Sequence, residues 1–116
     1  MEARELRIGN YIINGIGEVF EANGETINSF RVGQSLLGIF KPIPLTEEWL
    51  IKFGFIQYGD EGEYFKHKKL FAFEFLNQGI EFKVYFSDVV FTHVKHVHQL
   101  QNLYFSLTGK ELTIKE

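Results

Sequence analysis

The sequence predicts a single α+β domain over residues 1–116, and three patterns support this. Short apolar stretches in the first third are separated by Asn-Gly dipeptides, as in paired strands. Residues 70–86 alternate apolar and polar side chains on both sides of a turn, as a hairpin does. Residues 96–108 place their apolar side chains on one side of a helix. A subdivision into a β-meander (1–40) and a helix-hairpin-helix unit (41–116) stays open.

The composition fits one folded domain. A chain of 116 residues has the usual length of one domain, and 45% hydrophobic residues, with 13 Phe, provide for a core. The absence of cysteine excludes disulfides, thiolate chemistry and zinc fingers with Cys ligands, and it favours a reducing compartment. A net charge of −3 disfavours nucleic acid as a partner, because its binders neutralise phosphates with Lys and Arg.

No segment of the sequence has the features of a membrane or secretion element. The N-terminal MEARELRIGN carries two acidic residues and lacks the apolar run of a signal peptide. No stretch approaches the roughly 18 consecutive apolar residues of a membrane span. We therefore expect a cytoplasmic protein that is not bound to membranes.

The N-terminal strands are expected at residues 6–13, 17–22 and 26–32, as a three-stranded meander of the SH3-like kind. Residues 33–45 show no apolar period and contain both prolines, so we interpret them as an ordered connector. A short helix should follow. Thr46 is its N-cap, acidic residues occupy its first turn, and Gly54 ends it in the left-handed conformation.

The middle of the chain predicts antiparallel strands. Residues 55–58 and 63–67 flank a turn rich in glycine and acid, and residues 70–76 and 80–86 form the clearest hairpin, around Asn77-Gln78-Gly79. Its inward side chains are expected to be Phe71, Phe73, Phe75, Ile80, Phe82, Val84 and Phe86.

The C-terminal helix should lie across a sheet. At 100° per residue, one side carries Val97, Leu100, Leu103, Tyr104 and Leu107, and the opposite side carries Gln99, Asn102 and Ser106. Between them, one flank holds His98, Gln101 and Phe105, which we treat as a candidate binding group. The alternative is that His98 hydrogen-bonds a neighbouring backbone carbonyl, as half-buried histidines commonly do.

The run HVKHVH suggests a metal site at His93, His96 and His98, because imidazole is a common ligand for Zn, Cu and Ni. No regular conformation brings all three together. A helix places His96 and His98 about 160° apart, and a strand sets His93 opposite the other two. A two-histidine site completed by Asp88 stays an alternative. We predict no cofactor.

A basic cluster, Lys66-His67-Lys68-Lys69, is flanked by aromatic residues. Its lysines could contact a ligand or single-stranded nucleic acid. The interpretation we favour is a charged turn that keeps a sheet edge from aggregating, given the acidic total. An enzyme is disfavoured, because no nucleophile has a recognisable base and no glycine-rich segment has the context of a phosphate-binding loop.

Three segments together carry a resemblance: ELRIGNYI, KPIPLTEEWLIKFGF and VHQLQNLYFSLTGKEL. They resemble a group of small uncharacterised proteins encoded by phages, prophages and mobile elements of gut bacteria. The group has no assigned activity, so the resemblance implies genomic context and no mechanism.

We therefore expect an accessory protein of a phage or mobile element that acts by binding a host or phage protein, for instance as an inhibitor of a host defence component. This predicts an exposed apolar patch. One alternative is a small-ligand or nucleotide-sequestering protein, which requires a pocket with convergent polar groups. A metal-dependent hydrolase is a further alternative, and self-association stays open.

Overall fold

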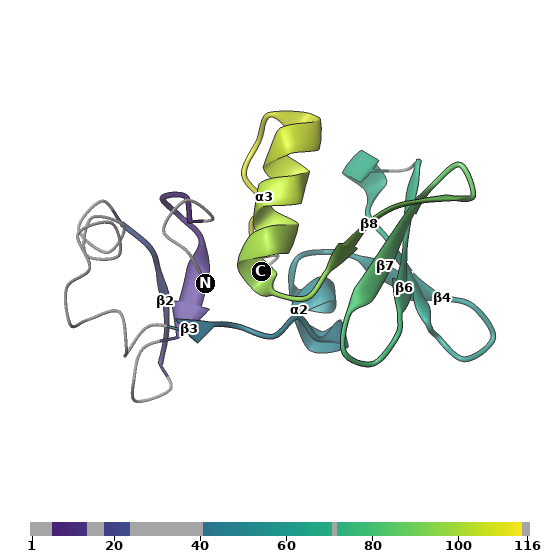
Figure 1. Ribbon diagram of the computed structural model, residues 1–116, viewed down its shortest axis with the longest axis horizontal. Helices are drawn as coiled ribbons and strands as arrows, with labels where there is room; N and C mark the ends of the chain where they lie inside the picture. The colour runs from purple at the N-terminus through teal and green to yellow at the C-terminus, as the bar shows by residue number, and fades with distance from the viewer. Residues whose placement is uncertain (1–5, 14–17, 24–40, 71, 115–116) are drawn as a thin grey trace.

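The computed structural model describes residues 6–13, 18–23, 41–70 and 72–114. Two antiparallel sheets lie at opposite ends of the molecule, and helix α3 stands between them (Figure 1). Helix α2 lies beside the base of α3. The predicted α+β class, with a short helix, a hairpin sheet and a C-terminal helix, is confirmed. In the described part of the chain, no helix is long and apolar enough to cross a bilayer.

The small sheet has the order β2-β1-β3. Strand β1 (Tyr11–Ile13) pairs with β2 (Val19–Glu21) on one side and with β3 (Lys41–Pro42) on the other. Strand β3 comes from the segment that we expected to be an ordered connector. The strand expected at residues 26–32 lies outside the described residues, so the SH3-like likeness stays a prediction.

The large sheet is an antiparallel meander in the order β4-β5-β6-β7-β8. The predicted hairpin is confirmed as β6 and β7, with Phe75 opposite Val84 and both side chains buried. The bounds are β4 (Ile56–Tyr58), β5 (Tyr64–Lys66), β6 (Phe73–Asn77), β7 (Phe82–Phe86) and β8 (Val89–Val94).

The large sheet corrects three expectations. Strand β8 was not predicted, and it pairs with β7 through a two-residue turn at Ser87 and Asp88, both of which have positive φ. Residues 68–70 form a 3₁₀ turn, η3 (Lys68–Leu70), so β6 begins later than expected. Ile80 is 84% exposed, because it lies in the turn before β7 begins.

Both predicted helices are confirmed. Helix α2 (Glu47–Lys52) is capped by the Thr46 side chain, which accepts from the Trp49 N–H, and Gly54 follows with φ of 91°. Helix α3 (Val97–Thr108) ends at Gly109, whose φ is 75°. Its apolar side faces the core as predicted, but Leu107 is 38% exposed at the end of that side.

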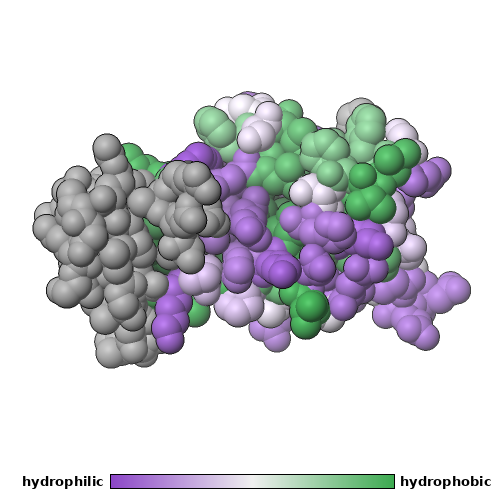
Figure 2. All heavy atoms as spheres, in the orientation of Figure 1, coloured by the Kyte–Doolittle hydropathy of each residue, from purple (hydrophilic) through white to green (hydrophobic). Residues whose placement is uncertain are grey.

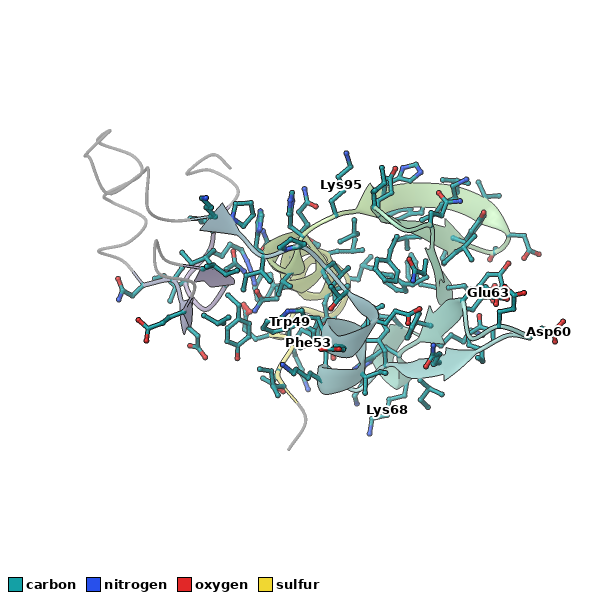
Figure 3. All side chains as sticks on the ribbon, turned by 90° about the horizontal axis from the view of Figure 1, so that it is seen from below. Trp49, Phe53, Asp60, Glu63, Lys68 and Lys95 are labelled. Carbon is teal, nitrogen blue, oxygen red and sulfur yellow. The ribbon has the colours of Figure 1, made fainter. Side chains whose placement is uncertain are left out.

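The main core lies between the large sheet and the helices. The small sheet joins this core through Tyr11, whose ring centroid lies 5.7 Å from Trp49 and 6.2 Å from Phe53. The two α2 rings are labelled in Figure 3. The buried core residues are Ile43, Leu45, Leu50, Phe53, Phe55, Phe65, Leu70, Phe75, Phe82, Val84, Val94, Val97, Leu100, Tyr104 and Leu112.

Candidate functional site

The polar pair on the predicted flank of α3 is buried. His98 and Gln101 are each about 1% exposed. The Gln101 side-chain amide accepts from the Tyr11 N–H at 2.8 Å and donates to the Gly9 carbonyl at 3.1 Å. Gln101 therefore holds the N-terminal segment against α3, and both ends of its amide are engaged inside the fold.

Phe105, the third residue of that flank, is 41% exposed and lies under Arg7. The guanidinium carbon of Arg7 is 4.2 Å from the centroid of the Phe105 ring. The same guanidinium binds Glu111, with Nη1 3.0 Å from Oε1 and Nη2 2.8 Å from Oε2. The predicted binding flank is thus the place where the N-terminal segment and the C-terminal tail meet α3.

The lysines of the predicted basic cluster lie on two elements. Lys66 lies on β5 and faces away from the core, with its Nζ 5.9 Å from the Tyr58 ring centroid. Lys68 lies in η3, beyond the end of that strand. Between them His67 is buried, with Phe55 and Tyr104 meeting its ring edge-to-face at 5.0 and 5.2 Å.

The three histidines of the HVKHVH run fall in different environments. His93 is exposed on β8, His96 is the N-cap of α3, and His98 is buried, although the rings of His96 and His98 stack at 5.8 Å. Asp88 lies in the turn at the other end of β8. Among the residues that the structure describes, no three His, Cys, Asp or Glu side chains group as metal ligands.

An exposed apolar surface lies at the β7–β8 turn, and sequence reasoning did not identify it. We call it the hairpin surface, and its residues are Phe73, Phe86, Val89, Val90 and Phe91. Val89 is 67% exposed, and Phe91 is 51% exposed. The Phe73 ring lies 4.9 Å from Phe86 and 5.4 Å from Phe91, so the three rings form one cluster. Figure 2 shows apolar side chains on the side of the molecule where this turn and the end of α3 lie.

The hairpin surface includes a sheet edge. Strand β8 is the last strand of the large sheet, and within the described ranges no strand pairs with its second side. Its first four residues, 89–92, contain neither charge nor proline, which are two of the devices that protect an edge, although the pairing with β7 is irregular at Phe91. The chain beyond β8 is covered, because Leu45 donates to the Lys95 carbonyl at 2.8 Å. The open stretch therefore coincides with the apolar residues.

The sequence signal for this surface was the segment FSDVVF, in which apolar residues flank a turn dipeptide. We expected Phe86 to point into the core, and it is 45% exposed. It lies on the core-facing side of β7, two residues beyond the buried Val84, at the end of the sheet.

Comparisons with protein-family models, with curated proteins and with solved structures found no match to this chain. The function is therefore argued from the geometry of its surfaces.

Proposed function

We propose that this protein acts by binding another protein, and that an extended segment of the partner adds as a sixth strand to the free edge of β8. The observation that carries the proposal is the coincidence of an uncharged strand edge, which no strand of the described residues pairs with, and the exposed apolar side chains of the hairpin surface. Strand addition supplies backbone hydrogen bonds along an edge and places alternate side chains in neighbouring contacts.

The geometry favours an extended partner segment over a bound helix. An edge strand presents a row of N–H and C=O groups, which only another strand satisfies regularly. The ring cluster of Phe73, Phe86 and Phe91 lies next to that edge and gives the partner's apolar side chains a place to pack. The Ser87-Asp88 turn fixes the start of β8, so little ordering should be needed on binding.

The resemblance to phage and mobile-element proteins supports the context of this proposal. We place the protein in the cytoplasm as an accessory factor, with a host or phage protein as its partner. The inhibition of a host component would follow if the added strand came from a functional loop of that component.

The proposal is tested with a displayed library of random 12-residue peptides selected on the immobilised protein. Enriched peptides should be rich in β-branched and aromatic residues, because these are favoured in strands. In hydrogen exchange, they should protect backbone amides within residues 89–92. Val90→Lys should weaken their affinity at least tenfold by placing a charge at the edge, and Ile80→Lys is the matched control on the exposed turn at the other end of β7.

Three results would overturn the proposal. One is protection that maps away from β8, and another is equal loss of affinity in both lysine variants. The third is a dimer in light scattering that Val90→Lys dissociates and Ile80→Lys does not, since the occupant of the edge would then be a second copy of this chain.

A further inference from the structure

A pocket of about 370 Å³ lies on the side of the large sheet away from β8, at the opposite edge strand β4. Five segments form it: the end of α2, strand β4, the turn η3 with the residue before it, helix α3, and the C-terminal tail that follows α3. Its volume is in the range of small-molecule sites. The lining residues are Phe53, Gly54, Ile56, His67, Lys68, Lys69, Tyr104, Glu111, Leu112 and Thr113.

The pocket combines an apolar interior with a cationic rim. Ile56 is 66% exposed and gives an aromatic or branched group of a ligand a surface to pack on, beside Phe53 and Leu112, which are 2% and 4% exposed. Lys68 and Lys69 are exposed at the rim, and Lys68 extends toward solvent (Figure 3). An apolar lining with a few charged groups is the usual composition of a ligand site.

His67 holds together the part of the pocket that η3 and the end of α2 form. Its Nδ1 accepts from the Lys69 N–H at 3.1 Å, and its ring is hydrogen-bonded to the backbone of Phe53. These two bonds connect η3 to the end of α2, and the flanking ring of Tyr104 fixes the plane of the imidazole. The backbone from which both lysines extend is therefore held by bonds within the fold.

The charge balance of the pocket favours an anion. Among the described lining residues the carboxylate is that of Glu111, which is engaged by both terminal nitrogens of Arg7 and is thereby offset. Lys68 and Lys69 remain as the charged groups at the rim. Burial lowers the pKa of His67 and the hydrogen bond to the Phe53 backbone opposes this, while the positive charges of Lys68 and Lys69 lower the pKa further.

We propose that this pocket binds a small amphipathic anion, that is, an aromatic or branched apolar group carrying one carboxylate or phosphate. The apolar group packs on Ile56, beside Phe53 and Leu112, and the anionic group lies at Lys68 and Lys69. The site is separate from the β8 edge, so it stands or fails independently of the strand-addition proposal.

The test is a titration of the full chain, followed in ¹⁵N-resolved NMR spectra, with phenyl phosphate and 3-phenylpropionate as probes. Both should shift the amides of Gly54, Ile56, Lys69 and Thr113. Inorganic phosphate, which lacks the ring, and 3-phenylpropanol, which lacks the charge, should each bind at least tenfold more weakly. The stronger of the two anionic probes identifies the preferred headgroup.

Matched variants distinguish binding in the pocket from nonspecific attraction to positive charge. The double variant Lys68→Gln with Lys69→Gln should lose at least tenfold in affinity, because both rim cations are removed. Lys95→Gln should bind as the unmodified chain does, since Lys95 lies on the opposite side of the molecule from Lys68 in Figure 3. The assignment would be refuted if 3-phenylpropanol bound as tightly as the anionic probes, or if the double variant bound them as tightly as the unmodified chain. It would also be refuted if the NMR shifts were confined to residues outside the pocket.

Discussion

Gln101 of α3 accepts a hydrogen bond from the backbone N–H of Tyr11, over 2.8 Å and across 90 positions of sequence. The same side chain donates to the carbonyl of Gly9, and it is almost fully buried. Gln101→Leu keeps the size of the side chain and removes both bonds. We expect the free energy of unfolding to fall by about 2 kcal/mol, because two backbone groups lose their partner in a part-buried place.

Chemical denaturation measures this loss, and Gln78→Leu is the control, since Gln78 is an exposed glutamine in the β6–β7 turn. The control should change stability by less than about 0.5 kcal/mol. A loss of similar size in both variants would mean that Gln101 contributes no more than a surface residue does.

The helical projection placed Gln101 correctly beside the apolar side of α3, but the projection did not reveal the role of this residue. A polar side chain at that position either binds a ligand or hydrogen-bonds polar groups of the same chain. Which of the two applies depends on the residues that lie next to it in the fold. Here the partners are Gly9 and Tyr11. No local pattern reveals a contact between segments so distant in sequence, so the sequence could locate this residue and not explain it.

The start of α3 depends on Gln99, which sequence reasoning placed on the side facing water. Its Oε1 accepts from the N–H of Lys95 at 2.9 Å and from that of His96 at 3.0 Å. Gln99→Ala removes both bonds, and we expect a loss of about 1 to 2 kcal/mol in the free energy of unfolding. Gln99→Glu keeps the acceptor and adds a negative charge in the first turn, which the helix dipole favours.

The pair of variants isolates the capping role. Gln99→Glu should be at least as stable as the original chain at pH 7, whereas Gln99→Ala should unfold at lower denaturant concentration. If the glutamate variant is as unstable as the alanine variant, the accepted bonds are not the source of the stabilisation.

The elements that were predicted correctly are those with local causes. Thr46 and Gly54 mark the ends of α2 by capping chemistry, and the β6–β7 hairpin follows from its alternation. Strand β8 has no such signal. Its first residues are exposed, and the register with β7 shifts after Val84, so Tyr85 pairs with Val90 and Val84 with Thr92. An irregular, exposed strand does not alternate, and alternation was the signal used to detect strands.

The stability of the fold should decrease in weak acid because of His67. Burial lowers the pKa of His67 below its usual value of about 6.5, and the neighbouring lysines lower it further, while the hydrogen bond to the Phe53 backbone acts in the opposite direction. The unfolded chain then binds a proton more readily than the folded chain. The stabilisation is complete above about pH 6.5 and is lost as the pH falls toward the lowered pKa of the folded state.

Denaturation at pH 7.5 and pH 5.5 tests this. His67→Gln should show a smaller difference in unfolding free energy between the two pH values than the original chain, whatever its absolute stability. The other histidines are present in both chains and cancel in the comparison. Identical pH dependence would exclude His67 as the responsible group.

Tyr58 should keep its proton at a higher pH than an ordinary tyrosine. Burial raises the pKa of Tyr58 above the usual value of about 10, and its hydroxyl also donates to the carboxylate of Glu74 across the sheet. Ionisation would break that bond and place two negative charges together. In ¹³C-ζ tyrosine NMR, Glu74→Gln should therefore lower the pKa of Tyr58. Burial raises the pKa of Tyr11, and the carboxylate of Glu21 raises it further. Glu21→Gln removes that carboxylate and should leave the Tyr58 titration unchanged. A shift of the Tyr58 pKa in this variant would show that general charge is responsible.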